Sequence, residues 1–177
     1  REDGMFDLAV NGGGLLTVAY DKAGYLGAQR QVNVPWRDYV WLPDVVLTQV
    51  DPVATTIDFS EPMQVAQGSV VSDGDGTRRN TLLFPQGAKA RLKFRGGASK
   101  ALGSLTVRVT EYSTGEEGPK AMPAELPPNS GYTYCVEFSA DEAKWRGAKV
   151  EFAEPVISYV ENWLNAEVGW AVPLGYY

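Results

Sequence analysis

The chain has 177 residues, of which 44% are hydrophobic and 21% are charged, so its composition is that of a folded globular protein and excludes wholesale disorder. Its net charge is −6, and its Lys and Arg residues are dispersed, so we expect no nucleic-acid partner because phosphates would be repelled. No apolar run approaches the roughly 18 residues of a membrane-spanning helix, and we therefore expect no membrane insertion.

The first third of the chain has the alternating pattern of β-strands. Residues 5–10 and 15–20 alternate apolar and polar side chains, and the Asn-Gly-Gly-Gly sequence of residues 11–14 between them favours a hairpin turn. A second turn at residues 21–24 leads into a strand over residues 25–34, which Pro35 ends. This pattern predicts a three-stranded meander.

A more continuously apolar strand is predicted over residues 40–50, interrupted at Pro43, and Asp51-Pro52 closes it. We therefore predict two units, a β-meander at residues 1–50 and a β-sandwich module at residues 51–177.

The second unit contains many short candidate strands separated by turn residues, a spacing typical of an antiparallel β-sandwich. These strands are predicted at residues 55–59, 67–71, 79–84, 90–94, 104–111, 131–139, 149–160 and 171–176. The fold class that follows is all-β.

One short helix is predicted near residues 140–146. Ser139 is a candidate N-cap, Glu142 stands three residues later as in a capping box, and Gly147 is a candidate end. Residues 115–131 carry four prolines and no clear period, so we predict a long surface loop there.

The absence of histidine removes Ser-His-Asp and Cys-His catalysis and imidazole-dependent zinc sites. The single cysteine, Cys135, forms no intrachain disulfide and leaves the compartment open; it has no evident base beside it, so we interpret it as a packed strand residue. Paired acids could still support a glycoside hydrolase, but spacing nominates no pair, and we favour solvated outer-face positions as the explanation of the candidates. These candidates are Glu111, Glu137, Glu151, Glu154 and Glu161. We expect no enzyme activity.

Residues 71–77 read Val-Ser-Asp-Gly-Asp-Gly-Thr, and alternating Asp followed by Gly can bring several oxygens to a calcium ion. The segment lacks the later glutamate of an EF-hand, and the same residues favour a hairpin turn. We expect no cofactor, and calcium at Asp73 and Asp75 remains the minority alternative.

Aromatic residues gather at Trp36, Tyr39 and Trp41, and again at Trp163 and Trp170. Exposed rings of this kind stack on sugars or anchor a protein partner, whereas core packing or an interdomain contact explains them equally well.

Residues 3–13, 16–18 and 22–26 resemble the latter half of a carboxypeptidase-regulatory-like, or transthyretin-like, β-domain, without its first strands. Residues 34–39, Val-Pro-Trp-Arg-Asp-Tyr, look like the segment that follows such a domain in large RHS or YD-repeat proteins, including the teneurin-like ones.

Residues 68–76, 83–88 and 105–107 look like the β-sandwich of ankyrins and netrin receptors. Residues 159–162 and 172–177, Tyr-Val-Glu-Asn and Val-Pro-Leu-Gly-Tyr-Tyr, are similar to sequences of the same RHS-protein region. The histidine that self-cleavage uses in related proteins is absent, so self-cleavage is not expected.

The resemblance implies a non-catalytic structural or interaction module of a large secreted or cell-surface protein, packing against or plugging a YD-repeat shell. The sequence has no signal peptide, and we interpret it as part of a longer chain whose other domains are its partners. The alternative is an adhesive or carbohydrate-binding sandwich that contacts a surface glycan or protein, with calcium as an optional stabiliser, and a glycoside hydrolase is the least favoured.

Overall fold

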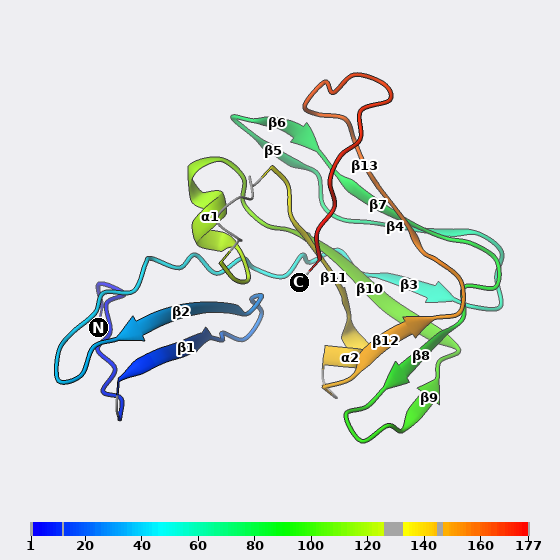
Figure 1. The fold of residues 1–177 in the computed structure, drawn as a ribbon. Helices are drawn as coiled ribbons and strands as arrows, with labels where there is room; N and C mark the ends of the chain where they lie inside the picture. Colours follow the sequence, from blue (N-terminus) through cyan, green and yellow to red (C-terminus); the bar gives the residue numbers. More distant parts are fainter. Residues whose placement is uncertain (1, 12, 126–132, 145–146, 177) are drawn as a thin grey trace.

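The computed structural model describes residues 2–11, 13–125, 133–144 and 147–176. Every strand pair among these residues is antiparallel, and the helical elements are short, which confirms the all-β prediction. Figure 1 shows the first two strands standing apart from the rest, with a short helix between the two groups. No helix in the described ranges is both long and apolar enough to span a bilayer.

The N-terminal group is a hairpin of β1 (Gly14–Tyr20) and β2 (Ala28–Val34), paired from Gly14 opposite Val34 to Tyr20 opposite Ala28. The turn between them is closed by a hydrogen bond of 3.0 Å from the Tyr25 amide to the Lys22 carbonyl. The two later strands of the predicted meander therefore form, although β2 begins at residue 28, three residues after the predicted start.

Two predicted strands in this region are absent from the described residues. Residues 5–10 form no ladder, and in residues 40–50 the only β-pairing is an isolated bridge between Gln49 and Tyr25. Alternation sets which side chains share a face, but a strand also needs a neighbour, and Pro43 has no amide to donate to one. The three-stranded meander was wrong in this respect.

The remaining strands form a sandwich-like arrangement around one core. One sheet has the order β13 (Ile157–Val160), β7 (Asn80–Phe84), β4 (Gln64–Gln67), and a second has β11 (Val136–Ala140), β10 (Ser104–Glu111), β3 (Thr55–Asp58). A third sheet joins β12 (Lys149–Phe152), β8 (Ala90–Lys93) and β9 (Ser99–Ala101), and the hairpin of β5 (Val71–Asp73) and β6 (Gly76–Arg78) extends beyond β7. The core includes Ile57, Leu82, Phe84, Leu105, Val107 and Val109.

The sequence located most of these strands, with three notable differences. The strand predicted at residues 67–71 was wrong, because residues 68–70 connect β4 to β5 and only the two end residues of the predicted range belong to those strands. The predicted strand at residues 149–160 is divided into β12 and β13 around Pro155, which cannot donate to a ladder. Residues 171–176 are extended but join no sheet. The prediction for residues 131–139 falls partly on residues 131–132, outside the described ranges, and β11 accounts for its second half.

The predicted helix is α2 (Asp141–Lys144); residues 145–146 lie outside the described ranges. Its capping box was wrong, because the Glu142 carboxylate accepts hydrogen bonds of 2.9 and 3.0 Å from the Thr106 amide of β10. Gly147 has φ 56°, as expected of a residue that ends a helix.

The predicted surface loop at residues 115–131 contains helical turns, η1 (Gly115–Glu117) and α1 (Gly118–Ala121), followed by the buried Met122. Pro119 lies in the first turn of α1, where a missing amide has no cost, so the prolines did not exclude a helix. Residues 126–131 of that prediction lie outside the described ranges.

Candidate interaction surfaces

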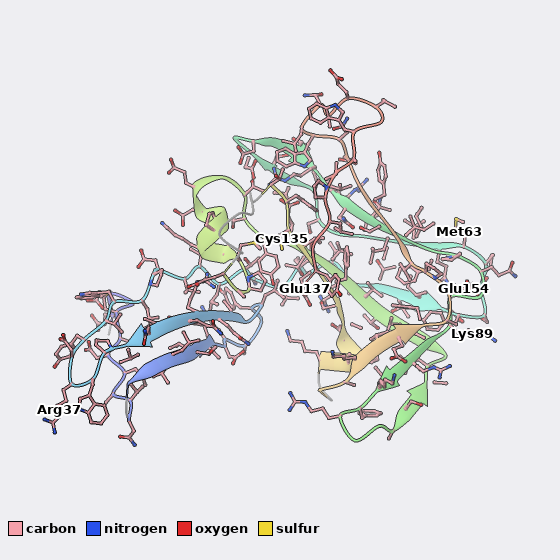
Figure 2. All side chains as sticks on the ribbon, viewed as in Figure 1. Arg37, Met63, Lys89, Cys135, Glu137 and Glu154 are labelled. Atoms are coloured by element: carbon pink, nitrogen blue, oxygen red, sulfur yellow. The ribbon has the colours of Figure 1, made fainter. Side chains whose placement is uncertain are left out.

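The first aromatic cluster lies on the segment that follows β2. Trp36, Tyr39 and Trp41 have exposed fractions of 68%, 94% and 82%. Arg37, between them, has φ 58°, a left-handed conformation that is uncommon for a residue with a side chain. Figure 2 places Arg37 at one extremity of the molecule, far from Met63 at the opposite one. The cluster is therefore a large apolar surface without a described covering.

The second aromatic group is divided between two environments. Trp163 is partly buried, and its ring lies 4.7 Å from the guanidinium carbon of Arg78. Trp170 is 67% exposed. Of the two, Trp163 thus has an internal role as a cation–π partner, whereas Trp170 is open to contact.

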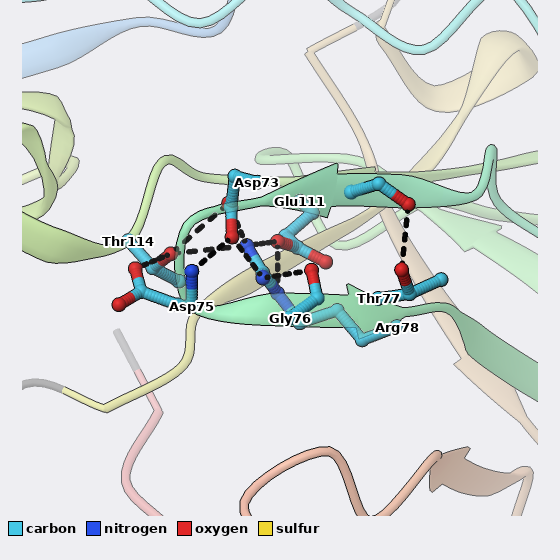
Figure 3. Close-up of polar contacts among 8 residues, drawn as sticks. Asp73, Asp75, Gly76, Thr77, Arg78, Glu111 and Thr114 are labelled. Carbon is cyan, nitrogen blue, oxygen red and sulfur yellow. Dashed lines mark hydrogen bonds and ion pairs between the residues drawn. The ribbon is translucent and has the colours of Figure 1, made fainter.

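Arg78 is the fully buried centre of a polar network at the β5–β6 hairpin (Figure 3). Its Nη1 and Nη2 donate to the two carboxylate oxygens of Asp73 at 2.9 and 2.7 Å, and its Nε donates to Glu111 Oε1 at 2.7 Å. Nη2 also donates to Thr114 Oγ1 at 3.0 Å. The hairpin is thereby bound to the end of β10, 33 residues away.

The two acids of this network have opposite pKa shifts. Hydrogen bonds from Arg78 hold the pKa of Asp73 well below its usual range. Burial raises the pKa of Glu111, and the hydrogen bond from Arg78 opposes that rise. Asp73 is therefore committed to the charged form as a partner of Arg78.

The proposed calcium residues form the hairpin turn that was the competing prediction. The Asp75 amide donates to Asp73 Oδ1 at 2.9 Å, Thr114 Oγ1 donates to Asp75 Oδ2 at 2.9 Å, and Gly76 has φ 135°. No group of three or more His, Cys, Asp and Glu side chains within the described ranges is arranged to hold a metal. A calcium ion would compete with Arg78 for both oxygens of Asp73, and calcium binding stays a prediction.

The candidate acids do not face a common substrate position. Thr110 pairs with Glu137, and Glu111 pairs with Val136, so alternation places Glu111 and Glu137 on opposite faces of the sheet. Glu151 forms an exposed ion pair with Lys93 at 2.6 Å. Glu154 and Glu161 are exposed on separate loops.

Cys135 was predicted to lie within a strand, but it immediately precedes β11, and it is half-buried. Burial raises the pKa of its thiol, which keeps it in the unreactive protonated form.

A buried connection between the two groups of strands was not found from sequence. Arg30 of β2 donates from Nη2 to the Lys120 carbonyl at 2.6 Å and from Nη1 to the Met122 carbonyl at 3.0 Å, just after α1. The Gln29 amide donates to the Pro123 carbonyl at 2.7 Å. Arg30 thus donates to two carbonyls at the end of α1, more than 85 residues along the chain, and the Lys120 carbonyl also accepts a hydrogen bond of 3.1 Å from the Val46 amide.

The predicted boundary residue, Asp51, is itself buried. Its carboxylate accepts hydrogen bonds from the Val53 amide at 2.7 Å and the Ser69 amide at 2.7 Å, and its own amide donates to Thr110 Oγ1 at 3.0 Å. The junction between residues 1–50 and 51–177 is therefore bound to the sandwich by specific contacts.

Comparison with known proteins finds a similarity to one family in the N-terminal part of the chain. Residues 1–47 match the family described as the Teneurin TTR-like domain. Residues 1–47 are teneurin-like. Teneurin-m of Drosophila melanogaster is 44% identical over 48 residues, which is 27% of this chain and 2% of that protein. Teneurin-3 of Danio rerio and of Mus musculus are 33% and 32% identical over 60 residues, 34% of this chain and 2% of each relative. No solved structure matches the chain.

The teneurin-like segment includes Trp36, Tyr39 and Trp41, whereas Arg78 and its partners lie outside it. The predicted resemblance to teneurin-like proteins is confirmed in this region. The aligned part spans about 2% of the length of the relatives, so the activities of those whole proteins are not assigned to this chain.

The chain exposes 12494 Å² of accessible surface, whereas a compact monomer of its 19.3 kDa mass exposes about 8,500 Å². Many of the exposed large apolar side chains lie in residues 5–10, in the segment after β2 and in the C-terminal segment.

Proposed function

We propose that the chain is a non-catalytic structural or interaction module of a large teneurin-like, RHS-type protein that is secreted or displayed at the cell surface. Its partners are other domains of that protein, and its work is to pack against, or plug, a YD-repeat shell. In this assignment the N-terminal group is carboxypeptidase-regulatory-like and the sandwich is of the ankyrin and netrin-receptor type.

The observation that carries this proposal is the excess of about 4,000 Å² of accessible surface over that of a compact monomer. A standard protein interface buries about 1,600 Å² in total, about 800 Å² on each partner, so the excess could supply several such contacts. Trp36 and Trp41 fit this role, because large exposed aromatic residues are typical anchors of interfaces.

Side-chain oxidation by hydroxyl radicals tests the proposal directly. Trp36 and Trp41 should be oxidised at least about tenfold more slowly in a parent protein containing this sequence than in the isolated chain, because neighbouring domains cover them there. Tyr112 is 4% exposed in the chain itself and is the matched control, with equal rates expected in both proteins. Equal oxidation of the two tryptophans in both proteins would exclude their burial against other domains.

An adhesive or carbohydrate-binding module is the second candidate, favoured by the exposed rings of Trp36, Tyr39 and Trp41. Under this alternative, a glycan array gives specific binding that Trp36→Ala and Trp41→Ala abolish, with Met63→Ala as the distant exposed control. If the array shows no glycan binding and the two tryptophans are protected from oxidation in the parent protein, the structural module is favoured.

The calcium part of this alternative has its own test, calorimetric titration of the metal-stripped chain. Saturable heat that Asp73→Asn and Asp75→Asn remove, together with a raised melting temperature, would support it. Absence of heat leaves residues 73–76 as a hairpin turn.

A further inference from the structure

The positive charge of the chain is concentrated in one stretch of its sequence. Residues 76–110 contain eight of the 16 Lys and Arg residues and no Asp or Glu, although the whole chain has a net charge of −6. The basic residues are therefore less dispersed than the overall composition suggests. Arg78 is buried, and Arg108 pairs with Asp141 at 2.9 Å, so the fold itself uses these two. The basic residues between positions 89 and 100 are all exposed, and they are Lys89, Arg91, Lys93, Arg95 and Lys100.

Strand β8 presents this charge on the outer face of its sheet. Across residues 89–95 the odd-numbered side chains are basic and exposed, whereas Ala90 and Leu92 between them are buried. Both edges of β8 are occupied, by β12 and β9, so a partner that meets this charge lies on the face and does not add a strand. Figure 1 shows these three strands together at one end of the sandwich, with the β5–β6 hairpin at the other.

The two neighbouring strands extend this face without covering it. Lys149 of β12 lies directly opposite Lys93, and two like charges in this position destabilise a sheet. On the other side, Ser99 and Ala101 of β9 lie opposite Lys93 and Arg91, and their short side chains leave both basic groups open to solvent. The arrangement of charge on this face therefore does not serve the stability of the sheet.

The acids beside this face neutralise only part of its charge. Glu151 of β12 lies opposite Arg91, and its carboxylate pairs with Lys93 Nζ at 2.6 Å, with both side chains about half-exposed. Glu154 follows β12, and it has no ion pair among the contacts of the described residues. A solvated protein surface normally mixes charges of both signs. Five basic side chains against these two acids leave a positive surface, defined here as the basic face, which consists of Lys89, Arg91, Lys93, Arg95 and Lys149.

We propose that the basic face binds a linear sulfated polysaccharide, which lies along β8. Side chains two residues apart on a strand are about 6.7 Å apart, so Lys89, Arg91 and Lys93 form a row of about 13 Å that a linear polyanion can follow. A sulfate group is a tetrahedral oxyanion like phosphate, and the planar guanidinium of Arg91 donates two parallel hydrogen bonds to such a group. Lys149 widens the row on the side of β12.

The composition of the face favours a polyanion over a protein partner. None of the outward side chains of β8, β9 and β12 is aromatic or large and apolar, so the face lacks the anchors that dominate protein interfaces. Charge supplies the attraction instead, and binding of this kind weakens as salt rises. The choice of a sulfated glycan over other polyanions rests on the secreted or cell-surface location proposed above, whereas the basic face itself does not depend on that location.

Calorimetric titration of the full chain with a heparin oligosaccharide at physiological salt tests the proposal. We expect saturable binding that the double variant Arg91→Gln, Lys149→Gln weakens at least about tenfold, because each basic group near a polyanion contributes to the affinity. The same variant should lower the slope of log affinity against log salt by about 2. The matched control, Lys22→Gln with Arg37→Gln, removes the same charge from exposed positions of the N-terminal group and should change the affinity less than about twofold, because distant charges are screened.

A variant with the opposite effect separates binding from stability. Glu151→Gln releases Lys93 from its ion pair and should strengthen heparin binding about two- to fivefold, the range that corresponds to an exposed ion pair. Its melting temperature should match that of the unchanged chain, because the substituted side chain is exposed. Unchanged or weaker binding by this variant would contradict the proposal.

The remaining outcomes are also decisive. Absence of heparin binding, or equal weakening by the two double variants, would overturn the proposal. Unsulfated hyaluronan, a DNA oligonucleotide and phosphatidylserine vesicles are the comparison probes. Binding of any of them as tightly as heparin would refute recognition of sulfated glycan, because the face would then respond to negative charge in general. Failure here leaves the oxidation test of the proposed function intact, since that test follows Trp36 and Trp41, which lie outside the basic face.

Discussion

Replacing Arg78 by Met should destabilise the fold more than any other single loss of charge among the residues described. The side chain keeps its length, but Glu111, 8% exposed, loses its charged donor and is left as a buried carboxylate without a cationic partner. Breaking a buried ion pair costs about 3–5 kcal/mol, and the lower end applies because the Asp73 side chain is 36% exposed and regains water. A loss of about 3 kcal/mol corresponds to a fall of about 6–12 °C in melting temperature for a domain of this size.

Urea unfolding at pH 7, followed by Trp fluorescence, measures this loss, with Arg91→Met, at an exposed position of β8, as the control. The control should change stability by less than about 0.5 kcal/mol, as surface substitutions usually do. Adding Glu111→Leu to Arg78→Met should recover part of the loss, because the unpaired carboxylate is then removed. A loss below about 1 kcal/mol for Arg78→Met, or no recovery in the double variant, would refute the view that Arg78 neutralises a buried acid.

Three further substitutions test other contacts. Burial raises the pKa of Glu137, so the folded state binds the proton of this carboxyl more tightly than the unfolded state does. The free energy of unfolding should therefore fall as pH rises from about 4.5 through the folded-state pKa. Glu137→Gln should flatten this fall, which urea unfolding at a series of pH values measures. Arg30→Met removes donors to the Lys120 and Met122 carbonyls and should speed hydrogen exchange in β1 and β2 while leaving β10 protected. Gly68→Ala places a Cβ atom 2.5 Å from the Val109 carbonyl oxygen and should cost about 1–3 kcal/mol, whereas Gly96→Ala, with no atom within 4 Å, should be tolerated.

Local patterns predicted the elements whose pairing is itself local or whose burial is regular. The strand predicted at residues 104–111 matches β10 because its apolar residues alternate strictly and face the core. The Asp-Gly turn of residues 73–76 was predictable because it needs only its own residues and a glycine with positive φ. The same signal could not distinguish a turn from a calcium loop, since the partner that occupies Asp73 is an arginine five residues further on.

What sequence could not supply was the identity of distant partners. Arg30 meets carbonyls about 90 residues away, and Glu142 meets an amide 36 residues away instead of capping its own helix. Nothing in the composition near either residue carries that information, because backbone carbonyls and amides occur at every position. Residues 5–10 and 171–176 show the opposite case, in which the local pattern is present and the partner is missing. Both segments alternate like strands, and neither pairs with a strand in the described structure.

The aromatic residues show why a functional prediction needs the fold as well as the sequence. Trp163 and Trp170 lie seven residues apart in one segment, and sequence alone could not decide for either residue between partner contact and core packing. Trp163 instead covers the guanidinium of a buried arginine, so its replacement would weaken the fold and any partner contact together. Trp36 and Trp41 have no such internal role among the described contacts, and a loss of binding on their replacement would report the interface itself. Experiments on partner contact should therefore begin with the N-terminal cluster, where stability and recognition can be separated.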